Sequence, residues 1–173
     1  MTRAELLFCL TTLSATAAAL VPGDAGAVLR TRFWYANATS YCQSALPVFD
    51  GNIRKRPLAV QNESRTSAFV TCSFAAQNTP LDSVTVFAFN GGDATVSFKC
   101  TGVTGGAGSV SNQYVAKTVS IPASDRDGLA WLPADFGSGT AIPGSGYFSV
   151  SCVLPPGVGI NDSVVVFDED VGT

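Results

Sequence analysis

Residues 67–74, which read Ser-Ala-Phe-Val-Thr-Cys-Ser-Phe, carry the pattern that decides the fold. Every second position from Ala68 to Phe74 is apolar, and the positions between them are polar except for Phe69. Successive side chains of a β-strand point to opposite faces of its sheet. The pattern therefore predicts a strand with one face in a core and the other towards solvent.

Similar extended runs lie on both sides of this stretch, separated by glycine and proline. They are residues 31–37, 83–90, 94–103, 113–121, 128–132, 147–154 and 163–167. The segment Asn90-Gly91-Gly92-Asp93 joins two of these runs and has the composition of a tight hairpin turn. No stretch shows a sustained helical period. We therefore predict an all-β fold, a single antiparallel β-sandwich of jelly-roll or immunoglobulin-like type, with about seven to nine strands.

Residues 1–27 have the features of a cleaved signal peptide. Arg3 precedes a mostly apolar run from Leu6 to Leu20, and Ala25-Gly26-Ala27 offers small residues for cleavage. The alternative is a membrane anchor, but the apolar run is shorter than the ~20 residues of a transmembrane helix. We expect a secreted, periplasmic or cell-surface protein whose domain spans residues 28–173, without a stable membrane anchor.

Cysteine usage supports an oxidising compartment. The chain has five cysteines, and Cys9 lies in the expected signal peptide. The other four are Cys42, Cys72, Cys100 and Cys152. No two of them have the close spacing typical of a zinc site, which is the competing interpretation. Of the three possible connectivities we favour Cys42–Cys72 and Cys100–Cys152, because Cys42 precedes the first strong strand and the last two cysteines lie within strands.

The composition argues against several classes of function. The chain has no histidine, 13% charged residues and a net charge of −3. The commonest general base and metal ligand is therefore missing, and no basic face is available for nucleic acid. The glycine-rich segments 102–108 and 137–146 lack a phosphate-loop ending, and Gly144-Ser145-Gly146 is not a nucleophile elbow. We predict a protein that is not an enzyme, with no cofactor and no nucleic-acid partner.

Two groups of carboxylates are weak candidates for a metal site. Asp125 and Asp127 begin a fragment like that of a calcium loop, but the position of the last ligand is Phe136. Asp168, Glu169 and Asp170 form an acidic end to the last run. They are candidates for calcium binding or for a glycosidase-type pair, although acidic ends usually serve solubility.

Basic and aromatic residues supply the candidate ligand-binding positions. Arg54, Lys55 and Arg56 either hold an anionic ligand or protect a sheet edge from unwanted pairing. Trp34, Tyr35 and Trp131 either stack on sugar rings or anchor strands to the core. Three Asn-x-Ser/Thr sequons begin at Asn37, Asn62 and Asn161.

We therefore expect an exported, non-catalytic β-sandwich with a structural or binding role and with a glycan or another protein subunit as its partner. One alternative is a carbohydrate-binding module, with calcium held by the carboxylates named above. Another is a fibre subunit whose residues 30–37 complete the sheet of the next subunit. A weak hydrolase that uses the clustered carboxylates ranks below these.

Overall fold

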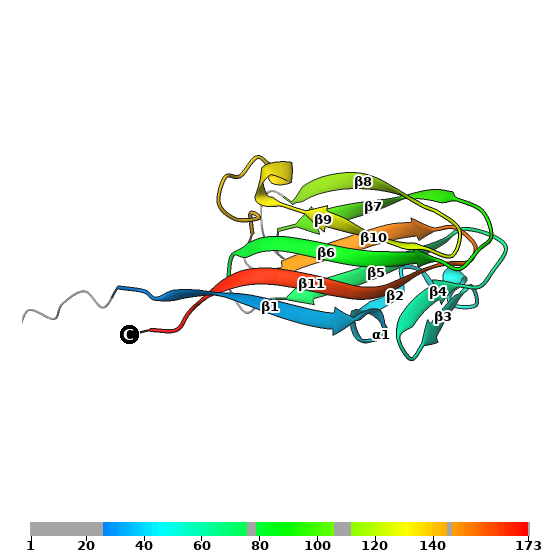
Figure 1. Ribbon diagram of the computed structural model, residues 1–173, viewed down its shortest axis with the longest axis horizontal. Helices are drawn as coiled ribbons and strands as arrows, with labels where there is room; N and C mark the ends of the chain where they lie inside the picture. The colour runs from blue at the N-terminus through cyan, green and yellow to red at the C-terminus, as the bar shows by residue number, and fades with distance from the viewer. Residues whose placement is uncertain (1–25, 76–78, 106–111, 145–146, 173) are drawn as a thin grey trace, which may run out of the picture.

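The protein is a sandwich of two antiparallel β-sheets (Figure 1). The computed structural model describes residues 26–75, 79–105, 112–144 and 147–172. Most of the expected signal peptide, with Cys9, therefore lies outside the described residues. Within the described ranges, no helix combines the length and apolar character needed to cross a membrane. The prediction of an all-β sandwich is confirmed.

Sheet A has the strand order β3-β4-β11-β6-β9, and β1 also pairs with β11. Its strands are β1 (Leu29–Asn37), β3 (Ile53–Arg56), β4 (Ala59–Asn62), β6 (Leu81–Asn90), β9 (Arg126–Trp131) and β11 (Val158–Asp170). Sheet B has the order β2-β5-β10-β7-β8. Its strands are β2 (Cys42–Ser44), β5 (Ala68–Ala75), β7 (Val96–Thr104), β8 (Gln113–Ile121) and β10 (Tyr147–Leu154). The helical turns are α1 (Ala38–Tyr41), η1 (Pro47–Phe49) and η2 (Pro133–Phe136).

The segment between β1 and β5 differs from the sequence-based expectation. Three short strands, β2, β3 and β4, lie in a stretch for which no strand was predicted. They have three or four residues each, too few for alternation to identify them. β11 is also longer than expected, because it begins at Val158 rather than at Ser163.

The predicted hairpin at residues 90–93 is wrong. β6 lies in sheet A and β7 in sheet B, so the chain crosses between the two sheets at this point. Asn90 is fully buried in the crossing, and its amide donates to the carbonyl oxygens of Ala94, Ile121 and Pro122 at 2.7 to 3.2 Å. A turn composition shows that the chain reverses but does not show which sheet receives it.

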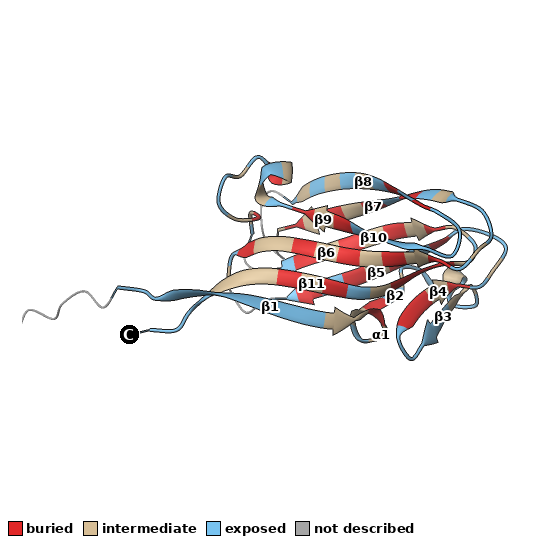
Figure 2. Ribbon diagram, in the orientation of Figure 1, coloured by how far each residue is buried: buried red, intermediate tan, exposed pale blue. Residues whose placement is uncertain are grey.

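The core lies between the sheets and contains the inward-facing residues of β5 that the sequence predicted. Val70, Cys72 and Phe74 have at most 2% of their surface exposed. Figure 2 shows buried positions alternating with less buried ones along β6 and β11. Such burial is the main favourable contribution to folding.

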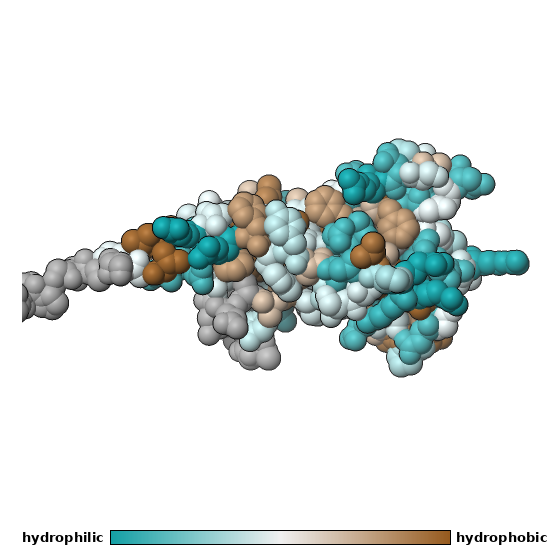
Figure 3. Space-filling model, turned by 60° about the horizontal axis from the view of Figure 1, so that its bottom comes forward, coloured by the Kyte–Doolittle hydropathy of each residue, from teal (hydrophilic) through white to brown (hydrophobic). Residues whose placement is uncertain are grey.

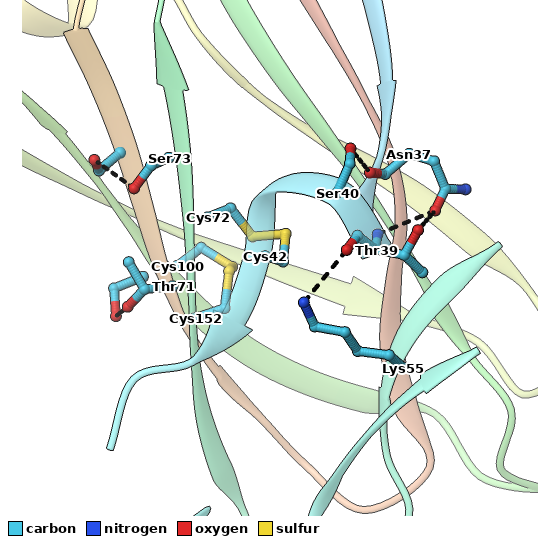
Figure 4. Close-up of a disulfide and its surroundings, with 12 residues drawn as sticks. Asn37, Thr39, Ser40, Cys42, Lys55, Thr71, Cys72, Ser73, Cys100 and Cys152 are labelled. Carbon is cyan, nitrogen blue, oxygen red and sulfur yellow. Dashed lines mark hydrogen bonds between the residues drawn. A yellow bond between two sulfur atoms is a disulfide. The ribbon is translucent and has the colours of Figure 1, made fainter. Parts of the chain in front are cut away.

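Both predicted disulfides are present and lie close together within sheet B (Figure 4). Cys42 is directly opposite Cys72, and Cys100 is directly opposite Cys152. The Cα atoms are 4.0 and 4.1 Å apart. The predicted connectivity is therefore confirmed, and each bond joins neighbouring strands of one sheet rather than the two sheets.

Candidate functional site

The outer face of sheet A carries an open groove of about 560 Å³. It crosses β1, β11, β6 and β9, which are hydrogen-bonded neighbours. The residues that line it are Tyr35, Ala36, Asn37, Phe87, Arg126, Asp127, Gly128, Asn161, Asp162, Ser163 and Val164. Because these residues lie on or beside paired strands, the groove has a rigid support.

The aromatic rings of the groove come from positions that alternation directs outwards. Tyr35 on β1 is 70% exposed, and it lies opposite Val164 on β11. Phe87 on β6 lies opposite Gly128 on β9. A Cβ atom at Gly128 would be 3.1 Å from the Phe87 ring, so the glycine lets this ring lie close to the sheet. Tyr35 and Phe87 are therefore the two aromatic rings of the groove.

Two further aromatic rings lie beside the groove. Phe89 lies opposite Gly159 of β11, where a Cβ atom would be only 2.5 Å from the ring. Phe33 stacks with Tyr35 on the same face of β1, with ring centroids 6.5 Å apart. Figure 3, in which the β1 side of the molecule comes forward, shows brown hydrophobic side chains separated by teal hydrophilic ones. Apolar faces on this part of the surface thus alternate with hydrogen-bonding groups.

The polar wall of the groove centres on Asp162. Its carboxylate accepts a hydrogen bond from Asn161 Nδ2 at 2.7 Å and another from Asn37 Nδ2 at 3.4 Å. Asn161 Oδ1 is buried and has no hydrogen-bond partner among the described residues. On the opposite side, Arg126 and Asp127 supply one charge of each sign. The groove therefore offers both donors and acceptors around two aromatic rings.

The sequence-based aromatic candidates do not form one platform. Trp131 is fully buried, and its indole N–H donates to the Val115 carbonyl oxygen at 3.0 Å. A surface ligand cannot reach this ring, so Trp131 as a ligand-binding residue is wrong and its alternative role in the core is correct. Trp34 is 39% exposed and meets Phe74 of sheet B edge-on, so it lies on the inner side of β1. Only Tyr35 of the three lines the groove.

The basic cluster lies on β3, which is one of the edge strands of sheet A. Arg54 and Arg56 both form ion pairs with Glu63, while Lys55 donates to the Thr39 carbonyl oxygen at 3.3 Å. The two arginines thus share a carboxylate of their own chain. This arrangement agrees with edge protection better than with a ligand site, because charged edges resist pairing with further strands.

The weak metal candidates are not gathered into a site. No group of three or more His, Cys, Asp or Glu side chains in the described ranges is arranged to hold a metal ion. Asp125 and Asp127 accept hydrogen bonds from the N–H groups of the residues that follow them. Asp168 accepts from the Thr31 hydroxyl, and Asp170 accepts from the Gly172 N–H. These carboxylates organise turns and the β1–β11 pair.

Sequence reasoning missed most of the groove. Phe87, Arg126 and Asn161 were not candidates, because each belongs to a different strand and only the register brings them together. One signal was present, since Phe87 and Phe89 occupy the outward phase of the run 83–90. Aromatic side chains on the solvent-facing phase of a strand indicate a surface that is used for contact.

No protein-family model matches the chain, and neither does any curated protein. One solved structure with a similar fold is a CBM35 module from Cellvibrio japonicus Abf62, which has 14% sequence identity to this chain and a TM-score of 0.44. The alignment covers 78% of this chain and 92% of that module. CBM6-3 from Clostridium stercorarium, solved in complex with cellobiose, has 15% identity, 77% and 92% coverage, and a TM-score of 0.44.

A third similar structure is a GH26-CBM35 mannanase from Podospora anserina, with 13% identity and a TM-score of 0.43. It is much longer, and 77% of this chain covers only 27% of it. These similarities assign neither a family nor a ligand to the chain.

Proposed function

We propose that the protein is an exported, non-catalytic module that binds carbohydrate in the groove on the outer face of sheet A. The observation that carries this proposal is the pairing of two exposed-face aromatic rings, Tyr35 and Phe87, with the amide and carboxylate groups of Asn37 and Asp162. The C–H face of a sugar ring packs on an aromatic ring, while its hydroxyls form hydrogen bonds at the ring edge. A shallow site with apolar walls and a few convergent polar groups suits such a ligand.

The charges favour a neutral glycan over an anionic one. Asp127 and Asp162 contribute two negative charges to the lining, and Arg126 contributes one positive charge. A uronic acid or sulfated sugar would meet net repulsion in this groove. Hydroxyl groups can instead donate to the carboxylates and accept from the guanidinium group.

Export is part of the same proposal and rests on separate support. The four cysteines of the domain are all paired in disulfides, which form and persist in oxidising compartments. The residues at the amino-terminal end have the features of a signal peptide, as described above. Glycans of cell surfaces and extracellular matrices are found in the compartment that both features indicate.

Affinity electrophoresis tests the proposal with soluble neutral polysaccharides based on glucose, xylose, mannose and galactose, and with polygalacturonate as the anionic probe. We expect retardation by at least one neutral polymer and none by polygalacturonate. Tyr35→Ala and Phe87→Ala should each weaken the retarding interaction by about tenfold, because each removes roughly 1 to 2 kcal/mol of ring contact.

Tyr114→Ala is the matched control, since Tyr114 is 66% exposed and lies on β8 of sheet B, away from the groove. This variant should bind like the unaltered protein. Absence of retardation by every neutral polymer would refute the proposal, and so would full binding by both groove variants.

The fibre alternative receives less support. It requires β1 to leave the sheet of its own subunit and join the sheet of another, whereas all nine residues of β1 pair in register with β11. Arg32 also forms an ion pair with Glu169 of β11 at 2.7 Å. Donation of this strand would sacrifice both sets of interactions.

A further inference from the structure

We infer that the free edge of β1 pairs with β1 of a second copy of this chain, antiparallel and centred on Phe33, so that the two A sheets become one continuous sheet. This inference does not depend on the proposed function. It rests on the exposure of β1, the direction of its backbone groups and the distribution of charge along it.

The outer edge of β1 has no strand beside it in the described ranges, and at its last residue the Asn37 amide donates to the carbonyl oxygen of Leu58 in the β3–β4 turn at 3.0 Å. β1 pairs with β11, and no strand in the described ranges pairs with its other side. β4 pairs with β11 at Gly159 and Ile160, before the β1 pairing begins at Asp162. Figure 2 shows β1 exposed along most of its length, and Figure 1 shows it with β11 at the border of the sheet. Such an edge is a template for another strand.

The backbone groups that face this edge can be identified. The Val171 N–H donates to the Val28 carbonyl oxygen at 3.0 Å, and these two residues continue the register of β1 and β11. In antiparallel pairs, hydrogen-bonded and non-hydrogen-bonded positions alternate. Even-numbered residues of β1 therefore bond to β11, while odd-numbered residues from Leu29 to Tyr35 turn their N–H and C=O groups outwards.

Charge excludes three of the possible registers of the pairing. Residues directly opposite each other must share a face, so the two-fold axis passes through one residue of β1. An axis at Arg30 or Arg32 would place identical charges opposite each other, and an axis at Thr31 would place Arg30 opposite Arg32. An axis at Phe33 avoids all of these contacts.

The register centred on Phe33 also uses the full length of the strand, because Leu29 then lies opposite the partner's Asn37. Phe33 meets its own copy on the outer face, where it is 59% exposed in the single chain. Arg32 faces the Trp34 of the other copy on the inner face, in an arrangement suited to a cation–π contact. The strand is thus complementary to itself.

The other sheet edges are shorter, charged or covered, which is why β1 is the edge we choose. β9, at the far edge of sheet A, has six residues and contacts β8 of sheet B. β3 carries Arg54, Lys55 and Arg56, and β2 has only three residues. β8 is as long as β1, but it contacts β9 and η2 and carries Lys117 paired with Asp135 at 2.6 Å. Short or charged edges are the usual means of preventing strand addition.

Sedimentation velocity of the disulfide-bonded protein without glycan, over a range of concentrations, tests this inference. We expect a monomer–dimer equilibrium. Phe33→Lys should reduce the association constant by more than about tenfold, because it places two ammonium groups opposite each other at the axis. Tyr114→Lys is the matched control on β8 and should dimerise like the unaltered protein. Because Phe33 is exposed, the melting temperature of Phe33→Lys should match that of the unaltered protein at concentrations low enough for the unaltered protein to be monomeric.

A second variant tests the register. Phe33→Cys should form a disulfide-linked dimer on mild oxidation, since directly opposed residues have Cα separations that a disulfide can bridge. Leu29→Cys should not, because Leu29 lies opposite Asn37 of the partner. The inference fails if the protein is monomeric at all concentrations, if it forms open assemblies larger than a dimer, or if Phe33→Lys dimerises normally. A monomer that still binds glycan would refute this inference and leave the proposed function intact.

Discussion

At the scale of the residue, asparagine side chains hold the connections between the sheets. The Oδ1 atom of Asn62 accepts from the N–H and the hydroxyl of Ser64, and its Nδ2 donates to the carbonyl oxygens of Thr66 and Leu154 at 2.8 Å. Asn37 holds Thr39 in the same way. Two of the three sequons therefore act as turn motifs, which the Asn-x-Ser/Thr spacing also provides.

Asn62 is fully buried, so its replacement should be costly. We expect Asn62→Ala to lower the free energy of unfolding by about 2 to 4 kcal/mol, because the buried carbonyl oxygen of Leu154 and the half-buried one of Thr66 lose their donor. The melting temperature should fall by roughly 5 to 10 °C. Asn52→Ala is the control, since the Asn52 amide makes a single 3.4 Å contact with Thr66. Equal melting temperatures for the two variants in a calorimetric scan would contradict this account.

Tyr41 links the pH of the solution to stability. Burial raises the pKa of Tyr41 to about 12, the nearby Ser163 hydroxyl opposes this shift, and the negative charge of Asp162 adds to it. In the unfolded chain a tyrosine titrates near pH 10. The folded state therefore retains its proton over a pH range in which the unfolded state has lost it, and stability decreases as the pH rises from about 10 to 12.

We expect Tyr41→Phe to reduce this alkaline loss of stability. Phenylalanine fills the same position against Phe74, where the ring centroids are 4.8 Å apart, and has no proton to lose. Urea titrations at pH 8 and at pH 11 measure the effect. The difference in unfolding free energy between the two pH values should be smaller in the variant, and an unchanged difference would show that Tyr41 does not contribute.

At the scale of the element, glycines decide how closely strands and rings approach. Gly102 on β7 faces the indole of Trp131, and a Cβ atom there would be 2.5 Å from the Trp131 Nε1 atom. The Phe148 ring packs against the same indole, with centroids 5.8 Å apart, and would lie 2.7 Å from that Cβ atom. Trp131 thus joins β9 of sheet A to β7 and β10 of sheet B.

Gly102→Ala should consequently displace a buried ring. We expect a loss of about 1 to 3 kcal/mol in unfolding free energy, the usual cost of overpacking a core. Chemical denaturation followed by tryptophan fluorescence measures it. Gly51→Ala is the matched control, because no atom lies within 4 Å of the position of its Cβ. A control variant as unstable as Gly102→Ala would show that the loss comes from the backbone and not from the ring.

At the scale of the whole molecule, the carboxylates are distributed among local partners. Arg32 and Thr31 on β1 engage Glu169 and Asp168 on β11, so the basic start of the domain is paired with its acidic end. This ladder holds β1 in place and leaves its outer edge and the groove exposed. The aromatic face and the open edge thus belong to the same border of sheet A.

We expect removal of divalent cations to leave both stability and glycan binding unchanged, because the carboxylates near the groove are engaged by side-chain and backbone donors of the chain. Melting curves with EDTA and with added calcium measure this. A rise of more than about 2 °C with calcium would indicate preferential binding to the folded state and would contradict the expectation.

The sequence determined the class of the fold and favoured the correct one of three disulfide connectivities. Alternation in residues 67–74 depends only on the two-residue period of a strand, and in-phase cysteines such as Cys72 and Cys152 are consequently directed into the core. Local periodicity is a property of neighbouring residues, so it can be seen in one dimension. Aromatic side-chain chemistry, not periodicity, identified Tyr35 as a candidate and gave the role in the core for Trp131 as one of two alternatives.

The register of distant strands, in contrast, could be seen only in three dimensions. Phe87 lies beside Gly128 and Asp162 because β6 pairs with β9 on one side and with β11 on the other. The crossing at Asn90 likewise depends on whether β7 pairs within sheet A or within sheet B. Both features result from contacts between segments far apart in the chain, whose energies depend on the whole core being assembled, and no local pattern records them.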